Sequence, residues 1–516
     1  MTQSAAAPAS VRSALDRVAL VADPGSFEPW DDDVVSDDPL DFTDSRPYRE
    51  RLADAEQRVG SREAVLCGHA TLGGRPLVVV AGEFGFLGGS IGVATGERVT
   101  RALERARERR VPVVALVASG GTRMQEGSLA LLQMAKIAAA ARRLRDDGLP
   151  YVVYFTHPTT GGVLAGWGSL GIVTFAMPAA LIGFGGPRVV ELMTGSRLPE
   201  GIQVAEHLYA RGLVDDLVAP AELRERVERV LSVASPGELE AAVATEPPDD
   251  PGAERLERDA RASLGHVRDP ARPEARELLA ACATDVTELR GDHAGGGDDP
   301  SCLLALARLR GIPVVVVAQS RERDRHGPAK MGPSGYRKAR RGMALANELG
   351  LPLVTVIDTA GAEMSVAAEE GGLSSEIARC LSDLSVVRTP TLAVLLGEGG
   401  SGGAVALVPA DRVICAEHAC LQPIAPEGAS AILYRTTERA SEMAETQGIA
   451  SWELERFGIV DRIVPEQPSA EREPEAFLER LGAAIEVELR ELVERDAAER
   501  LAARARRYRA VGNPTD

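Results

Sequence analysis

Two glycine-rich stretches are the parts of this sequence best suited to chemistry. "ALVASGGTRMQEG" covers residues 115–127, and "VLLGEGGSGGAVALVPADRV" covers residues 394–413 with one carboxylate, Glu398, among its glycines. Each stretch begins with an apolar run typical of a buried strand. A glycine pair after such a strand lets the backbone turn with positive φ and come within contact of a ligand. A helix that follows directs its free N–H groups and the positive end of its dipole at the same point, so the pattern predicts a site for anionic oxygen.

A turn of this kind has three alternative functions. A phosphate cradle and an oxyanion hole for a reacting carbonyl both need this backbone. A Walker loop requires G-x-x-x-x-G-K-[ST], and no Lys-Ser or Lys-Thr follows these glycines. No G-x-G-x-x-G pattern with a suitable acidic residue downstream supports a dinucleotide site either. The third use is close packing of a helix on a strand, which also selects glycine.

Other catalytic and metal-binding patterns are missing from the sequence. The seven histidines form no evident Ser-His-Asp or Cys-His arrangement. The six cysteines are dispersed and include no C-x-x-C pair, so neither a disulfide framework nor a zinc ribbon is supported, and we predict no metal site. A reducing, cytoplasmic location is the expected one.

Composition excludes several classes of protein. The chain has 516 residues, of which 45% are hydrophobic, so it can bury large cores and is too long for one ordinary domain. Its net charge of −18 argues against general affinity for nucleic acid or anionic membranes, which both need a basic surface. Residues 158–187 carry no charge, but their frequent glycines predict a buried globular segment rather than a membrane span.

The sequence also contains a duplication. "RVPVVALVASGGTRMQEG" matches "GLPLVTVIDTAGAEMSVAAEEGG" with Pro112 on Pro352, an offset of 352 − 112 = 240. "LPYVVYFTHPTTGGVLAGW" matches "TPTLAVLLGEGGSGGAVAL" with Pro150 on Pro390, again an offset of 390 − 150 = 240. Shared order and a nearly constant offset indicate two copies of one unit.

Each copy shows the same local pattern. "VPVVALV", "YVVYF", "LPLVTVI" and "TLAVLL" lack alternation, as expected of strands covered on both faces. "MQEGSLALLQMAKIAAAARRLRDDG" and "SSEIARCLSDLSVVR" space apolar residues as amphipathic helices do. Strand, turn and helix repeated in this way predict an α/β fold. We divide the chain into a partly disordered segment 1–45, a first domain 46–240, a linker or helical excursion 241–295 and a second domain 296–516.

Several longer motifs of the sequence resemble those of a known family. "ASGGTRMQEGSLALLQMAKIAAA", "YVVYFTHPTTGGVLAGWGSLG" and "PAALIGFGGPRVVE" resemble the β carboxyltransferase subunit of bacterial acetyl-CoA carboxylase. "GYRKARRGMALANELGLPLVTVIDTAGA", "EGGLSSEIARCL" and "GEGGSGGAVAL" resemble the α subunit. The chain thus resembles a fused pair, as in the single-chain β subunits of biotin-dependent acyl-CoA carboxylases. The resemblance implies two crotonase-like (ClpP/crotonase) domains of ββα-superhelix form.

The resemblance also implies a reaction. Carboxybiotin would give CO2 to the α-carbon of an acyl-CoA of acetyl or propionyl type, through an enolate on the thioester oxygen. The ureido oxygen of biotin also gains negative charge, so two oxyanion sites are needed, one from each copy. We assign the acyl-CoA side to the first domain and the biotin side to the second. The expected catalytic residues are Gly120, Gly121 and Thr122 on the thioester side and Gly402, Gly403 and Ala404 on the biotin side, with substrate contacts from Ser119, Gly161, Gly162, Gly361 and Arg188.

The implied enzyme is incomplete by itself. A biotin carrier presents its lysine in an M-K-M turn, whereas the lysines here lie in "QMAKIA", "PAKMGP" and "YRKAR", and no glycine-rich ATP loop is evident. A separate biotin carboxyl carrier protein and biotin carboxylase are therefore expected partners, with a role in fatty acid biosynthesis. The family also implies a homo-oligomer, dimer or higher, with active sites shared between subunits. Acyl-chain preference does not follow from the sequence.

Alternatives remain at this stage. A decarboxylase of malonyl-type thioesters would use the same enolate site. A non-catalytic scaffold is a second alternative, because "DTAGAEMS" departs from the family's D-T-P-G-A-Y-P-G and places Glu363 at the tyrosine position. Single polar residues are also open to two interpretations: His157 and Glu398 are expected to be structural rather than catalytic, and the arginine-rich stretch 319–338 is either a site for CoA phosphates or a solvated loop.

Overall fold

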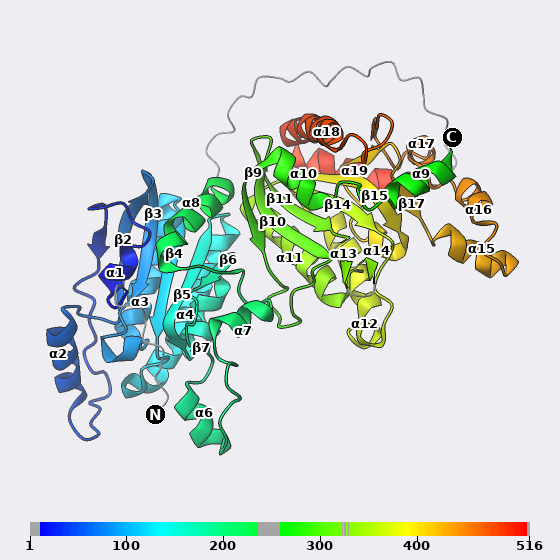
Figure 1. Cartoon of the computed structure of the whole chain (residues 1–516). Coiled ribbons are helices and arrows are strands. Elements are labelled where there is room, and N and C mark those ends of the chain that lie inside the picture. The colour runs from blue at the N-terminus through cyan, green and yellow to red at the C-terminus, as the bar shows by residue number, and fades with distance from the viewer. Residues whose placement is uncertain (1–10, 236–258, 322, 325–326, 329, 513–516) are drawn as a thin grey trace. The chain divides into compact units, whose positions relative to one another are not determined.

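A computed structural model describes residues 11–235, 259–321, 323–324, 327–328 and 330–512 of the protein. The chain forms two compact units (Figure 1). Unit 1 comprises Met1–Ser235 with His293–Gly295, and unit 2 comprises Pro236–Asp292 with Gly296–Asp516. Among the described residues, no helix is both long enough and apolar enough to cross a membrane.

Unit 1 is built on one mixed sheet of eight strands in the order β1-β2-β3-β4-β5-β6-β8, with β7 paired to β5. The β1, β2 and β3 strands are antiparallel neighbours, whereas β3 to β6 and β8 run parallel. The strands are β1 (Glu28–Trp30), β2 (Val65–Leu72), β3 (Arg75–Gly82), β4 (Val113–Ser119), β5 (Tyr151–Thr160), β6 (Val173–Ala176), β7 (Ile182–Gly183) and β8 (Asp216–Leu217). The helices of at least five residues are α1 (Ala14–Val18), α2 (Tyr48–Val59), α3 (Val93–Arg109), α4 (Gly127–Asp146), α6 (Pro187–Thr194), α7 (Ala205–Ala210) and α8 (Leu223–Ala234), with the shorter η1 (Leu87–Gly89), η2 (Met124–Glu126), α5 (Gly162–Ala165), η3 (Trp167–Leu170) and η4 (Pro220–Glu222).

Unit 2 repeats this sheet. Its order is β9-β10-β11-β14-β15-β16-β18, with β17 paired to β15 as β7 is to β5. The strands are β9 (Ala283–Leu289), β10 (Cys302–Leu309), β11 (Ile312–Gln319), β14 (Leu353–Thr359), β15 (Thr391–Gly400), β16 (Arg412–Ala416), β17 (Cys420–Gln422) and β18 (Arg462–Val464), beside the small pair β12 (Arg323–Asp324) and β13 (Gly327–Pro328). The helices are α9 (Ala260–Val267), α10 (Ala275–Cys282), α11 (Pro333–Leu349), α12 (Val366–Glu370), α13 (Leu373–Ser385), α14 (Ser401–Val405), α15 (Pro426–Tyr434), α16 (Ala440–Thr446), α17 (Ser451–Arg456), α18 (Pro474–Glu494) and α19 (Ala497–Ala510).

The duplication is confirmed down to single pairs of residues. β4 and β14 begin at residues 113 and 353, which differ by 240. In both units the pairing of the two central strands shifts register near its end: Ser119 then pairs with Thr159, and Thr359 with Gly399. Equivalent strands therefore end in equivalent irregular turns, and the predicted α/β fold with two copies is correct.

The central strands are buried for the reason that the sequence indicates. Every residue of β4 and of β14 is buried, because helices cover the sheet and leave no face for polar residues. The long helices α3 and α4 pack on each other in unit 1, as α11 and α13 do in unit 2 (Figure 1). Both expected amphipathic helices are present, as α4 and α13.

The borders of the two units differ from the sequence-based division. Residues 11–45, which we expected to be partly disordered, are part of unit 1: the Arg17 side chain of α1 is buried and donates to Gly82 O (3.2 Å) and Thr156 Oγ1 (3.1 Å). Much of the expected linker 241–295 folds onto unit 2, where α9, α10 and β9 pack against its sheet. Both segments have an acidic, proline-rich composition, which is why we did not expect them to fold onto the units. A few of their apolar and arginine side chains nevertheless hold them there. Residues 241–258 of that linker lie outside the described residues.

Candidate functional site

The first glycine turn closes β4 of unit 1. Gly121 has φ +114°, a conformation that favours glycine. Its N–H is bonded to Ser119 Oγ (3.1 Å), and the Gly120 N–H to Gly88 O (2.7 Å). Within the part of unit 1 that the structure describes, the Thr122 N–H has no acceptor. Thr122 is therefore the residue of the three with a backbone donor available to a ligand.

A second turn meets the first one. Gly161 follows β5 with φ +75° and caps α5, whose first residue is Gly162. A Cβ on Gly161 would lie 2.6 Å from Gly121 Cα, so the two backbones touch where no side chain fits. The Gly162 N–H lies at the start of a helix, where backbone donors have no intrahelical acceptor. The structure therefore brings the predicted residues Gly121, Thr122, Gly161 and Gly162 together.

Unit 2 contains the same arrangement. Gly361 has φ +138°, and its N–H is bonded to Thr359 Oγ1 (3.2 Å), as that of Gly121 is to Ser119 Oγ. Among the described residues, the Ala362 N–H has no acceptor. A Cβ on Gly403 would lie 2.6 Å from the Ala362 nitrogen, so the start of α14 packs directly on this turn. Gly402 and Gly403 lie in the first turn of α14, whose N–H groups lack intrahelical acceptors.

Three of the other predicted site residues lie differently. The Ser119 hydroxyl is buried and is used within the protein, because it donates to Gly89 O (2.6 Å) and accepts from Gly121 N. Ala404 is completely buried in α14. Arg188 is exposed in the first turn of α6, a helix without any buried residue. Sequence reasoning missed Ala362, although it is equivalent to Thr122 at the offset of 240.

Glu398 and Asp358 are buried beneath the second turn. Glu398 Oε1 accepts from Gln422 Nε2 (2.7 Å) and Arg268 Nη2 (2.9 Å), so this carboxylate has the structural role that we expected. Its own N–H donates to Asp358 Oδ1 (3.0 Å). Burial raises the pKa of Asp358 to about 6, against the opposing charge of Arg321, whose Nε lies 2.8 Å from Oδ2.

Other polar candidates have structural partners. His157 Nδ1 accepts from Leu181 N–H (3.1 Å), and burial lowers the pKa of this imidazole. Lys338, in the arginine-rich stretch, donates to Asp298 Oδ1 (2.7 Å) and Cys302 O (2.7 Å) and is buried. Residues 322, 325–326 and 329 of that stretch lie outside the described residues. Glu363 lies with its carboxylate against Gly332 at the start of α11, where the helix dipole favours a negative charge.

Comparison with known proteins identifies the family of this chain. A family model described as acetyl co-enzyme A carboxylase carboxyltransferase-like matches residues 254–512. A probable biotin-dependent acyl-coenzyme A carboxylase beta3 subunit from Mycobacterium tuberculosis is 49% identical over 96% of this chain and 98% of its own length. This chain belongs to the carboxyltransferase family of biotin-dependent acyl-CoA carboxylases. The fused carboxyl transferase subunits beta/alpha of the acetyl-coenzyme A carboxylase from Saccharopolyspora erythraea are 44% identical over 97% of the chain and 89% of that protein.

Solved structures confirm the fold of this carboxyltransferase. Transcarboxylase 12S, determined as a hexamer with methylmalonyl-coenzyme A bound, superposes with a TM-score of 0.71 at 22% identity, covering 90% of this chain and 89% of the other. A single-chain, multi-domain long-chain acyl-CoA carboxylase gives a TM-score of 0.68 at 19% identity and covers 90% of this chain and 46% of the other. The expected crotonase-like fold with two domains is thus correct, and so is the family resemblance.

The raised pKa of Asp358 predicts that the stability of this carboxyltransferase depends on pH. The folded-state pKa of about 6 lies above the ordinary value of 3.8, so the folded state binds the Asp358 proton more tightly than the unfolded state does. This proton therefore stabilises the folded state below about pH 4, and its contribution to the unfolding free energy is lost as pH rises from about 4 to 6. Asp358→Asn cannot titrate. We expect the unfolding free energy of the wild type to fall by about 3 kcal/mol relative to the Asn variant across that window and to level off above it. Urea unfolding of both proteins at pH 4, 5, 6 and 7 measures this difference, and a difference independent of pH would contradict the assignment.

Proposed function

We propose that this chain transfers the carboxyl group of carboxybiotin, held on a separate carrier protein, to the α-carbon of an acyl-CoA of acetyl or propionyl type. The observation that supports it is the pair of equivalent turns, each of which carries a backbone N–H without an acceptor among the described residues and packs against a glycine at a helix start. In unit 1 the donors are Thr122 and Gly162, and in unit 2 they are Ala362 with Gly402 and Gly403.

The chemistry needs such donors twice. Loss of the α-proton places negative charge on the thioester oxygen, and two N–H groups fixed in a buried turn stabilise that charge without reorganising. Removing one such donor costs about 10²- to 10³-fold in rate in other enzymes. The second turn would hold the ureido oxygen of biotin, which carries negative charge as the carboxyl group leaves. We assign unit 1 to the thioester and unit 2 to biotin.

The protein's own contribution is orientation and charge stabilisation. The hydroxyls of Ser119 and Thr359, at the ends of β4 and β14, are both bonded to backbone groups. His157 accepts a backbone N–H and its pKa is lowered, so it is placed as a structural residue. In the proposed reaction, carboxybiotin would supply the carboxyl group, and the biotin left after CO2 departs would accept the α-proton.

Activity should require a biotinylated partner. We expect the purified chain, mixed with acyl-CoA, ATP, bicarbonate, biotin carboxylase and a biotinylated carrier, to form carboxylated acyl-CoA, and to form none when the carrier lacks biotin. Product formation followed by mass spectrometry measures this. A panel of acyl-CoA lengths in the same assay defines the substrate. Carrier-independent loss of CO2 from malonyl-CoA would instead support a decarboxylase, and no reaction with any carrier would support a scaffold.

Replacing one glycine in each turn should separate the binding of acyl-CoA from the reaction with biotin. Gly121→Val places a β-branched residue at φ +114° and a Cβ 3.3 Å from Gly161 Cα, so acyl-CoA binding should weaken at least tenfold. Gly403→Val places a Cβ 2.6 Å from the Ala362 nitrogen. This variant should lose biotin-dependent turnover by 10²-fold or more while acyl-CoA still binds.

Calorimetry of acyl-CoA binding and biotin-dependent decarboxylation of the product measure the two effects. Gly60→Val is the matched control, because Gly60 also has positive φ (71°) but a Cβ there has nothing within 4 Å. With all variants folded, an inverted pattern would reverse the assignment of the units. Unchanged values in both assays would mean that the glycines serve packing alone.

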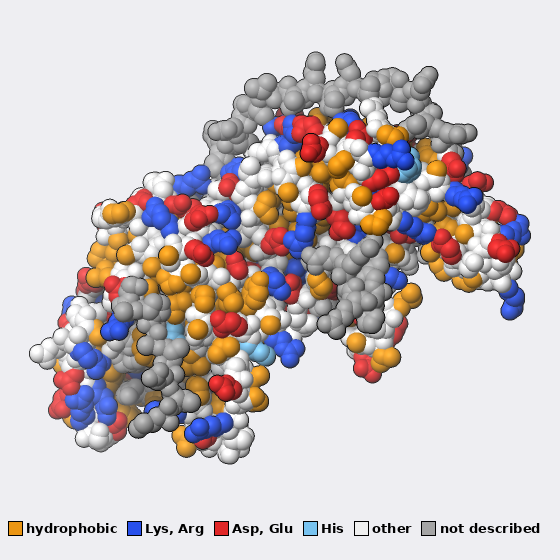
Figure 2. Space-filling view, viewed as in Figure 1, with side chains coloured by type: hydrophobic (Ala, Val, Ile, Leu, Met, Phe, Trp, Pro, Cys, Tyr) orange, Lys and Arg blue, Asp and Glu red, His pale blue; other side chains and the backbone are white. Residues whose placement is uncertain are grey.

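We also propose that the enzyme is a homo-oligomer with shared sites, as the resemblance implies. Equivalent helices of the two units carry unburied apolar side chains: on α6, Leu192 is 84% and Met193 81% exposed, and on α15, Ile432 is 70% and Leu433 65% exposed. Hydrophobic side chains also reach the surface near both helices in Figure 2. Monomeric proteins rarely leave such patches open, and obligate interfaces bury about 2,000–5,000 Å².

Light scattering at micromolar concentration should give a dimer or a larger oligomer. The double change Leu192→Glu with Met193→Glu should shift the measured mass toward that of a monomer. Carboxyl transfer should then fall, since each shared site loses the unit that the other subunit contributes. Leu15→Glu, at an exposed leucine of α1 (63%), is the matched control and should leave the mass unchanged. A fully active monomer would contradict the shared site.

A further inference from the structure

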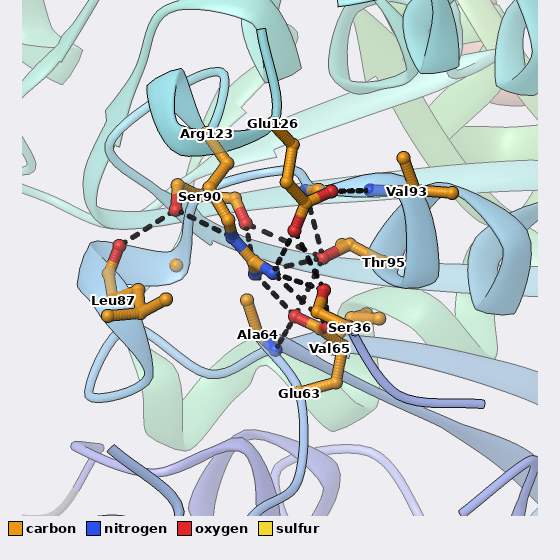
Figure 3. Close-up of polar contacts among 12 residues, drawn as sticks. Ser36, Glu63, Ala64, Val65, Leu87, Ser90, Val93, Thr95, Arg123 and Glu126 are labelled. Carbon is orange, nitrogen blue, oxygen red and sulfur yellow. Dashed lines mark hydrogen bonds and ion pairs between the residues drawn. The ribbon is translucent and has the colours of Figure 1, made fainter. Parts of the chain in front are cut away.

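A fully buried arginine directly follows the first glycine turn. Arg123 comes one residue after Thr122, and its side chain has no exposure to solvent. Figure 3 shows its guanidinium surrounded by acceptors from segments far apart in the sequence. Its contacts are Ser36 Oγ (2.8 Å), Tyr48 OH (3.3 Å), Glu126 Oε1 (3.1 Å), Ser90 O (2.8 Å), Ser90 Oγ (3.3 Å), Thr95 Oγ1 (3.3 Å), and both carboxylate oxygens of Glu63, of which Oε2 lies at 3.3 Å.

The charges of this cluster balance locally. Burial opposes ionisation of Glu63, yet the Arg123 charge and hydrogen bonds hold the pKa of Glu63 below its ordinary value. Glu126 is also completely buried, and its second oxygen accepts the Val93 N–H at the start of α3. The positive end of that 17-residue helix offsets the second carboxylate. Arg123 therefore stays charged in a site where its removal would leave two buried carboxylates.

The guanidinium and the turn hold the same strip of backbone, residues 88–91. The Gly120 N–H donates to Gly88 O (2.7 Å), and Ile91 N–H donates to Gly121 O (2.8 Å). The Arg123 N–H donates in turn to Ile91 O (2.9 Å), while its side chain binds Ser90. Arg123 thus fixes the segment that sets the orientation of the peptide between Gly121 and Thr122, the one that carries the Thr122 N–H.

We propose that Arg123 is a positioning residue for carboxyl transfer: through Ser90 and Ile91 it holds the Thr122 N–H in the direction of the thioester oxygen. The inference rests on the proposed function of this turn. Because the N–H acts on charge that develops during the reaction, loss of its orientation lowers kcat more than it raises KM for acyl-CoA. A purely structural arginine would change stability without this selective effect.

The test compares Arg123→Lys with Arg98→Lys. Arg98 is a matched control, since it is equally buried in unit 1 and donates to Val34 O (2.8 Å) and Val65 O (3.3 Å), which belong neither to the turn nor to residues 88–91. Lysine keeps the positive charge, but its single nitrogen cannot reproduce contacts that the guanidinium makes through Nε, Nη1 and Nη2. We expect Arg123→Lys to lower kcat by about 10- to 100-fold with KM changed less than threefold, and Arg98→Lys to keep kcat within threefold.

A second measurement does not depend on catalysis. Amide hydrogen exchange of peptides covering residues 115–127 should be faster in Arg123→Lys than in the wild type and unchanged in Arg98→Lys. If the wild type transfers no carboxyl group but this exchange increases, the proposed function fails, and what stands is only that Arg123 holds the backbone of the turn. If exchange and kcat are unchanged in Arg123→Lys, or if Arg98→Lys loses as much kcat, the role of Arg123 is refuted.

A conservative variant covers the case in which Arg123→Lys does not fold. Glu126→Gln keeps the shape of a side chain that contacts both Arg123 and the start of α3 but removes its charge. We expect kcat to fall several-fold and exchange of residues 115–127 to increase. Wild-type values for both quantities in this variant would overturn the proposal.

Discussion

The structure depends on a contact between two stretches of bare backbone. At the ends of β4 and β5, Gly121 and Gly161 approach so closely that one methyl group would separate them. The register shift between these strands makes this approach possible, and the same shift occurs between β14 and β15. The parallel strands are covered on both faces, and this packing holds their ends in place. The backbone N–H donors of the turns that follow are therefore fixed before any ligand binds.

Each unit supports its turn with buried charges, but the two use different residues. In unit 1, Arg123 comes after the turn and pairs with Glu63 and Glu126. In unit 2, Asp358 comes before the turn and lies beside Arg321. Buried ion pairs are weak contributors to stability, whereas breaking one is costly. Their value here is geometric, since a charge that must keep its partner also keeps the backbone around it in one conformation.

The strands and the first glycine turn could be predicted because each is local in sequence, and the duplication because these local patterns recur in the same order at an offset of 240. The run "VVALVA" has no polar residue to face water and is rich in β-branched valine, so it predicts a buried strand. The roles of Ser119 and Arg123 were harder to predict from the sequence. A serine beside a glycine turn, for example, is equally suited to bind substrate and to hold the backbone. Only the acceptors around them, Gly89 O for the hydroxyl and Glu63 for the guanidinium, show that both point into the protein.

By itself, the sequence determined that two copies of a strand-turn-helix unit exist and that glycine occupies each turn, because backbone conformation and burial leave their mark on neighbouring residues. It also determined the family, through long motifs in the same order. Tertiary structure decided which N–H groups remain unbonded. Gly120 and Gly121 carry the motif, yet their N–H groups are bonded to Gly88 and Ser119, while those of Thr122 and Ala362 have no acceptor among the described residues. Hydrogen-bond partners come from segments distant in the chain, and no spacing in the sequence records which of them meet.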